Sequence, residues 1–227
     1  MVNAASFLPG ISPGGLATIF GNNLTDVSGV VTAGGTPLPF QLAGVEVHVN
    51  GTPAPLFSVA FANGEDQISF QVPFETDTGP GAVTIDVVSF GTTTASLVVD
   101  SFTEDPGIFV YNGFAVAAHV DGKLVTPDDP AGPGETIVLY ATGLGPVTVD
   151  VPDGAPAPSN PLAYTEDPFQ AFVGGEQCSV PFSGLAPGFV GVYQLNLTLP
   201  RDLPSGNLDI QISTPYASSG ITKLPVF

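Results

Sequence analysis

The strongest constraint on the fold is a short phrase that the chain repeats 120 residues later. Pro13-Gly14 opens the first copy, PGGLATIFGNNL, and Pro133-Gly134 opens the second, PGETIVLYATGL. In each copy the Pro-Gly is followed by a β-rich run that ends in an aromatic residue, and a leucine closes the phrase. Self-similarity at a fixed spacing indicates a duplication. We therefore predict two copies of one domain in the 227 residues.

The rest of the sequence indicates that these domains are all-β. Hydrophobic residues make up 43% of the chain and charged residues 11%, and 28 Gly and 24 Pro supply frequent turns. Apolar residues alternate with polar ones in VEVHV and QLNLTL, which is the period of a half-buried strand, and no stretch shows a helical period. We predict two tandem immunoglobulin-like β-sandwiches, with helix limited to a turn or two.

The second half repeats the strands of the first in the same order. VEVHVNGTPAPLF is matched by FQAFVGGEQCSVPF, and DQISFQVP by YQLNLTLP. We place the boundary near Asp105-Pro106, so the predicted domains are residues 1–105 and 106–227. The second domain is expected to add an N-terminal hairpin that turns at Asp121-Gly122 and a proline-rich insertion near 144–164.

Longer motifs carry a resemblance to known families. SPGGLATIFGNNL resembles the opening of IPT/TIG immunoglobulin-like domains. Almost the whole chain resembles the Solibacter-type C-terminal domain family of secreted acidobacterial proteins, through PLPFQLAGVEVHVNGTPAPLF, ISFQVPFE, DPGIFV, VLYATGLGPV, DGAPAP and LAPGFVGVYQLNLTLP. The resemblance implies an extracellular β-module appended to a larger protein, with no catalytic residues to transfer. The chain departs from the family in its acidity.

The charge balance limits the partners and the location. The net charge is −18, and the three basic residues are Lys123, Arg201 and Lys223. Nucleic acid is excluded as a partner because its binding requires cations that neutralise phosphates. No run of 18 apolar residues could span a membrane. The N-terminus lacks the basic start and apolar core of a signal peptide; we expect that such a segment was removed and that the protein is extracellular or at the cell surface.

The residues that usually perform catalysis are scarce, so we predict that the chain is not an enzyme. Cys178 lies in an apolar alternation and is expected to be a buried, inert thiol. His48 and His119 lie in different halves and are expected to be surface strand residues. The paired carboxylates are expected in solvated turns, at Glu65-Asp66, Glu104-Asp105, Asp128-Asp129 and Glu166-Asp167.

Calcium is the one metal for which the sequence offers candidate ligands, and no other cofactor is predicted. Calcium prefers six to eight oxygen ligands, mostly carboxylates and loop carbonyls. Four carboxylates near the predicted domain junction are the candidate ligands: Glu104, Asp105, Asp128 and Asp129. No EF-hand spacing supports them, and ordinary surface charge is the competing interpretation.

Two classes of function are open. The first is a non-catalytic structural or interaction module, either a spacer or adhesive domain or a subunit of an extracellular fibre, with the N-terminal VNAASFLPGIS or the C-terminal ITKLPVF as the added β-strand. The second is a calcium- or polysaccharide-binding module appended to a secreted enzyme. It would use the loop from Leu144 to Tyr164, with Asp150 and Asp153.

Overall fold

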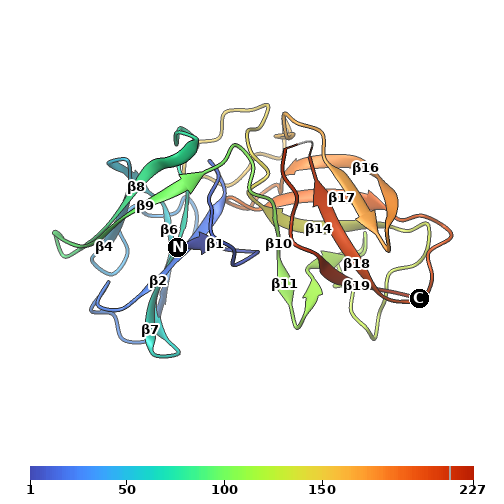
Figure 1. The fold of residues 1–227 in the computed structure, drawn as a ribbon, viewed down its shortest axis with the longest axis horizontal. Helices are drawn as coiled ribbons and strands as arrows, with labels where there is room; N and C mark the ends of the chain where they lie inside the picture. Colours follow the sequence, from blue (N-terminus) through green and yellow to red (C-terminus); the bar gives the residue numbers. More distant parts are fainter. Residues whose placement is uncertain (215) are drawn as a thin grey trace.

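The computed structural model describes residues 1–214 and 216–227, which form two β-sandwiches side by side (Figure 1). The described residues contain no helix, so even the short helical turns allowed by the sequence are absent from them. Each sandwich encloses its own apolar core. The chain is thus an all-β protein of two tandem immunoglobulin-like domains.

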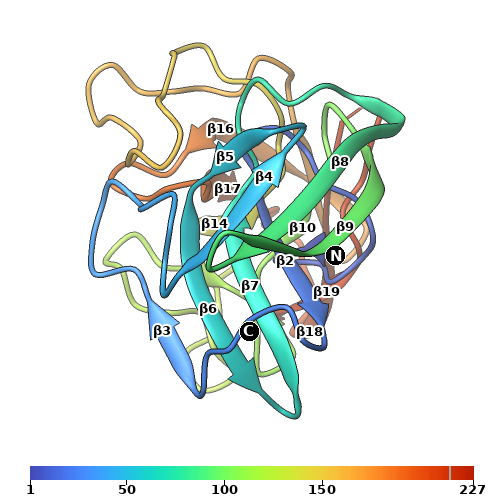
Figure 2. The ribbon, with the colours of Figure 1, turned by 90° about the vertical axis from the view of Figure 1, so that its left-hand side faces the viewer.

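The first sandwich packs a five-stranded sheet of order β1-β2-β7-β6-β3 on a four-stranded sheet of order β5-β4-β8-β9 (Figure 2). Alternation places Val45, Val47 and Val49 of one strand in the core. The strands are β1 (Val2–Asn3), β2 (Leu16–Gly21), β3 (Val30–Thr32), β4 (Val45–Val49), β5 (Thr52–Ala54), β6 (Leu56–Ala62), β7 (Glu65–Gln71), β8 (Gly79–Ser89) and β9 (Thr92–Ser101).

The two layers of the second sandwich are joined into one ten-stranded sheet, because one long strand pairs with β15 in one layer and with β17 in the other. An irregularity between Ser179 and Phe182 bends that strand, β16, from one layer into the other. The strands are β10 (Gly107–Ile108), β11 (Val110–Tyr111), β12 (Phe114–Ala115), β13 (Ala117–Ala118), β14 (Thr136–Thr142), β15 (Gln170–Val173), β16 (Glu176–Leu185), β17 (Tyr193–Thr198), β18 (Gly206–Ser213) and β19 (Thr222–Val226).

The strand orders confirm the duplication. The series β1-β2-β7-β6 of the first sandwich is matched by β10-β14-β17-β16, and β5-β4-β8-β9 by β16-β15-β18-β19. The repeated phrase forms β2 and β14. Ile19 of β2 lies opposite Ile68, and Leu139 of β14 lies opposite Leu195, all four in the cores. The repeated phrase therefore supplies the same central strand to each domain.

One threonine links the two sandwiches at the end of β14. The Thr142 hydroxyl accepts a hydrogen bond from the Leu16 amide (2.9 Å) and donates one to the Gly191 carbonyl (2.7 Å). Nearby, the side-chain amide of Asn3 donates to the Asp105 carbonyl (2.7 Å). Because these groups are buried or partly buried, each bond costs more to lose than a solvated one.

The proline-rich insertion contributes a second set of contacts by docking on the first sandwich (Figure 2). The Leu38 amide donates to the Gly154 carbonyl (2.8 Å), and the Gly154 amide donates to the side chain of Gln71 (2.7 Å). The Asp153 carboxylate accepts from the Phe74 amide (3.0 Å). Asp153, expected in a ligand-binding loop, therefore holds the domains together.

The structure also corrects the expectation for Glu65-Asp66. These residues lie in β7 and not in a solvated turn, and Asp66 is buried. Its carboxylate accepts a hydrogen bond from the Leu24 amide (2.8 Å) and so fixes the loop that follows β2. The β6–β7 turn forms at the neighbouring Asn63-Gly64, where both residues have positive φ, and the strand begins directly after it.

Both segments proposed as donor strands are hydrogen-bonded within their own fold. Val2 and Asn3 pair with β2, and Ile11 bridges to Ser101. At the other end, β19 pairs with β18 and, through Lys223, with β12. A strand added between molecules would therefore use a different edge.

Candidate functional site

Two of the four candidate calcium ligands, Glu104 and Asp105, lie in the segment that joins the sandwiches, but they point to different neighbours. Glu104 is buried, and one of its carboxyl oxygens accepts a hydrogen bond from the Thr214 hydroxyl. The Asp105 carboxylate lies 3.3 Å from the side-chain amide of Asn3. Burial raises the pKa of both carboxyls, and the bonds from Thr214 and Asn3 offset part of that effect.

The other two candidates lie on an exposed loop of the second sandwich. Asp128 and Asp129 are both exposed, and the Asp129 amide donates to the Thr126 hydroxyl (3.1 Å). The structure does not join this loop to the Glu104 segment in one site. Among residues 1–214 and 216–227, no group of three or more His, Cys, Asp or Glu side chains could hold a metal ion.

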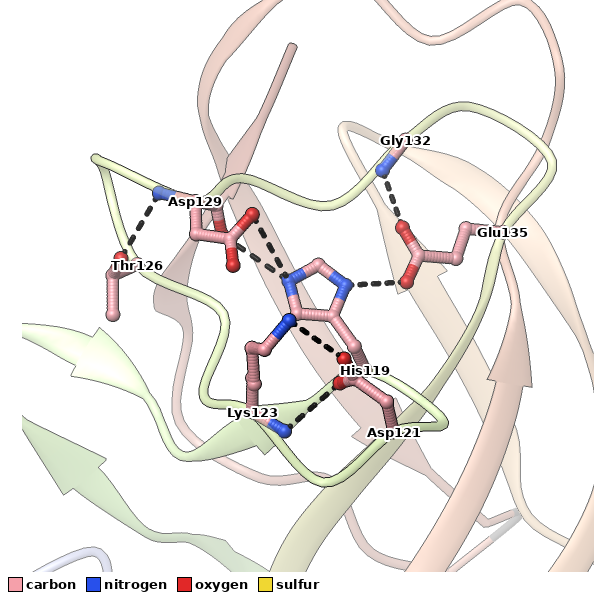
Figure 3. A network of polar contacts seen from close by, with 7 residues as sticks. All are labelled: His119, Asp121, Lys123, Thr126, Asp129, Gly132 and Glu135. Carbon is pink, nitrogen blue, oxygen red and sulfur yellow. Dashed lines mark hydrogen bonds and ion pairs between the residues drawn. The ribbon is translucent and has the colours of Figure 1, made fainter.

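His119 organises the loop of Asp128 and Asp129 (Figure 3). Its Nδ1 lies 2.5 Å from Glu135 Oε1, and its Nε2 lies 3.3 Å from the Asp129 carbonyl. Glu135 also accepts a hydrogen bond from the Gly132 amide (2.7 Å). The bond to Glu135 is the main reason why the pKa of His119 is raised.

The expectation for His119 is therefore wrong. The side chain is only 15% exposed and lies just after β13, in a turn and not on a strand. The sequence placed His119 and Glu135 in one region but gave no sign that the chain folds back between them. His48 does lie on β4, as expected, beside Glu46 (2.9 Å).

A cavity of about 660 Å³ lies between the two sandwiches. The loop after β7 contributes Phe74 and Glu75, and the insertion contributes Val149 and Asp150. Glu166 completes a set of three exposed carboxylates around this opening. Asp150 was a candidate from the sequence, whereas Phe74 and Glu75 were missed because only the packing of the domains brings them there.

A groove of about 700 Å³ lies along the β11–β12 hairpin and is mainly apolar. Tyr111, Phe114 and Leu124 line it, and Tyr111 and Leu124 are exposed. The hairpin turns at Asn112-Gly113, where both residues have positive φ, which suits a tight two-residue turn. The predicted turn at Asp121-Gly122 forms as well, closed by a bridge between Ala118 and Leu124.

A smaller hollow of about 380 Å³ opens beside Glu104. It is lined by two acidic residues, Glu104 and Asp167, two aromatic residues, Phe102 and Tyr216, and two small residues, Thr103 and Ala217. Both rings are exposed. A pair of carboxyls flanked by aromatic faces is suited to a positively charged organic group.

Cys178 takes no part in any of these sites. It is buried in β16 opposite Ala171, and burial raises the pKa of its thiol to about 11. A thiol that stays protonated at neutral pH and is shielded from solvent is a poor nucleophile. The expectation of a buried, inert cysteine agrees with this geometry.

Comparison with known proteins assigns the chain to no family. No protein-family model matches it, and no curated protein does. SGBP-B of the mixed-linkage glucan utilization locus of Bacteroides ovatus, solved in complex with a mixed-linkage heptasaccharide, is 11% identical with a TM-score of 0.36; the match covers 96% of this chain and 43% of that one.

Two further solved structures show the same low level of similarity. A titin tandem of immunoglobulin domains is 10% identical with a TM-score of 0.25, over 96% of this chain and 92% of that one. Domains of the surface layer protein SbsC are 12% identical with a TM-score of 0.29, over 100% and 30%. The fold assignment rests on the strand order and register of this chain.

The described residues include no helix that is long and apolar enough to cross a membrane.

Proposed function

We propose that this chain is a non-catalytic, extracellular interaction module whose two domains act as one rigid spacer. The observation that carries the proposal is the set of hydrogen bonds across the domain boundary, from the Leu16 amide to Thr142 and between Gly154 and the first sandwich. Tandem domains joined only by a linker move relative to each other, whereas these are fixed at two separate places. The resemblance of the sequence motifs to the Solibacter-type family supports an appended, secreted module.

Small-angle X-ray scattering tests the rigid spacer. We expect one two-lobed particle to fit the wild-type profile over a wide concentration range. A profile that fits only a broad distribution of distances between the domains would contradict the proposal. A variant with Thr142→Val, which removes both hydrogen bonds of the hydroxyl, should broaden that distribution, whereas Thr136→Val, at the far end of β14, should not.

Two surface features favour protein partners. Strand β9 lies at the edge of its sheet, is ten residues long and carries one charge, at Asp100. Its free edge is limited at one end by the bridge from Ser101 to Ile11. Long edge strands with few charges can pair with another strand. The apolar groove at Tyr111 and Leu124 is a second surface of the kind that proteins recognise.

Assembly through β9 can be tested by placing a charge on it. Val98 is 65% exposed on this strand, so Val98→Lys should leave the core intact. If the wild-type protein forms fibres at high concentration in electron micrographs, we expect the variant to form none. Fibres of equal length from both proteins would exclude this edge. The matched control is Val30→Lys on the opposite sheet, at β3.

Ligand binding between the domains is the second candidate function. The cavity at Phe74, Glu75, Asp150 and Glu166 has the size of a small-molecule site and combines an aromatic ring with carboxylates, as sugar sites do. Calorimetric titration with soluble β-glucan, xylan and calcium chloride tests it. Binding that is lost in Asp150→Asn would support the candidate, and the absence of heat with all three would count against it.

A further inference from the structure

Glu104 presents an unusual situation for a carboxyl group. The residue is 5% exposed, and its Oε2 accepts a hydrogen bond from Thr214, but its Oε1 has no hydrogen-bond partner. Buried polar atoms are nearly always paired, and a buried, unpaired charge is costly. The carboxyl therefore needs either a proton or a positive charge from elsewhere.

The neighbouring carboxyl increases this need. Asp167 stands beside Glu104 in the wall of the same hollow, and the pKa of Glu104 is raised first by burial and then by the charge and contact of Asp167. Two adjacent carboxyls cannot both ionise without repulsion. A cation placed between them would allow both to ionise.

The chain itself does not supply that cation. Lys123 pairs with Asp121 (2.8 Å) and Lys223 pairs with Asp209 (2.6 Å). The side chain of Arg201 lies against Gly134. The chain has no further Lys or Arg, so a lysine or arginine side chain that binds at this hollow would come from another molecule.

We propose that the hollow at Glu104 and Asp167 binds an alkylammonium or guanidinium group, with its charge on the two carboxyls and its flank on Phe102 and Tyr216. Both aromatic residues are exposed and line the same hollow as the acids, and aromatic faces attract organic cations. Calcium fits less well, because it requires six to eight oxygens and gains nothing from aromatic rings. A volume of about 380 Å³ also exceeds what one metal ion needs.

This site goes beyond the spacer role and does not depend on it. A cationic side chain of a partner protein and a free polyamine share the required chemistry. The segment that forms the hollow belongs to the domain junction, so a bound cation would contact the first residues after β9, Phe102 to Glu104, and the β18–β19 loop at Tyr216.

Titration of ¹⁵N-labelled protein, followed by nuclear magnetic resonance at pH 7, tests the proposal. The probes are N-acetyl-lysine methylamide, N-acetyl-arginine methylamide, spermidine and calcium chloride. We expect saturable shifts of the Phe102, Asp167 and Tyr216 amides with at least one organic cation. Saturation by the blocked amino acids assigns the site to protein side chains, and saturation by spermidine alone assigns it to polyamines.

Variants separate this site from general attraction to an acidic protein. Asp167→Asn should weaken binding about tenfold, as for the loss of one partner of a partly buried charge pair. Glu104→Gln should weaken it similarly while keeping the Thr214 hydrogen bond, so folding is retained. Glu166→Gln is the matched control, because it removes the same charge one residue away but lines the other cavity.

Three results would overturn the proposal. The first is the absence of saturable shifts at the hollow with all organic cations. The second is binding of calcium alone, which would make the site a metal site. The third is an equal loss of affinity in Glu166→Gln and Asp167→Asn, which would show only the effect of net charge. None of these results bears on the rigidity of the two domains.

Discussion

At the residue scale, we expect His119 to make the stability of the second domain dependent on pH. Glu135 raises the pKa of His119, so the folded state binds the imidazole proton more tightly than the unfolded state does. This contribution to stability is fully present below the unfolded pKa of about 6.5. It is lost as the pH rises through the higher pKa of the folded state.

The expected result is a melting temperature that falls from pH 6 to pH 9 more steeply in the wild type than in His119→Gln. Differential scanning calorimetry at several pH values measures this difference. Asp121→Asn is the control, because it removes a nearby acid that pairs with Lys123 and keeps the contact with Glu135. Parallel slopes for wild type and His119→Gln would show that the pair does not couple to folding.

The thiol of Cys178 should not react in the native protein. Burial in β16 raises its pKa to about 11, so little thiolate exists at pH 8 and that little is shielded. We expect no labelling by a thiol reagent until denaturant is added. Ser179→Cys in a Cys178→Ser background places the thiol on the exposed next position and should react within minutes. Rapid labelling of the native wild type would contradict this prediction.

At the scale of the elements, a buried tyrosine joins β17 to the loop after β14. The Tyr193 hydroxyl donates a hydrogen bond to the Gly145 carbonyl (2.5 Å), and burial raises its pKa. Tyr193→Phe would leave that buried carbonyl unsatisfied, at a cost of about 1–3 kcal/mol in the free energy of unfolding. Urea denaturation measures this loss.

Tyr140→Phe is the matched control for Tyr193→Phe. Tyr140 lies on the adjacent β14, is partly exposed, and packs its ring against Phe189 at 6.5 Å between centroids. That packing is kept in phenylalanine, so the expected change is within about 0.5 kcal/mol. Equal losses in the two variants would mean that the hydroxyl of Tyr193 does not support the loop.

At the scale of the whole molecule, Gly143 decides how closely the sandwiches approach. It has a φ of +76°, and a Cβ at this position would lie 2.2 Å from the Asp105 carbonyl of the junction. Gly113 has a similar φ of +83°, but nothing lies within 4 Å of a Cβ there. Alanine would therefore bring similar backbone strain at both positions, but only at Gly143 would its Cβ also clash with the junction.

Gly113→Ala should cost about 1–2 kcal/mol, the usual cost of a left-handed conformation. Gly143→Ala should cost a further roughly 1–3 kcal/mol for the clash, and it should also broaden the distances between the domains in X-ray scattering. Chemical denaturation gives the first comparison. Similar losses and similar scattering for both variants would show that the junction tolerates a shift.

The sequence alone determined the class and the repetition of the fold. Alternation with a period of two fixes which face of each strand is buried, so Val45, Val47 and Val49 could be assigned to a core from their spacing. The Pro-Gly phrase marked β2 and β14 because turn chemistry is local. Its two copies indicated the duplication that the strand orders confirm.

Only the tertiary structure decided the contacts between residues that are distant in the sequence. Leu16 and Thr142 are 126 positions apart, and Glu104 and Thr214 are 110 apart, so no local pattern links them. Asp66 and His119 were misplaced because a turn signal or a polar residue shows neither burial nor partner. The insertion docks on the first sandwich, and the hollow at Glu104 exists, because domain packing brings these surfaces together.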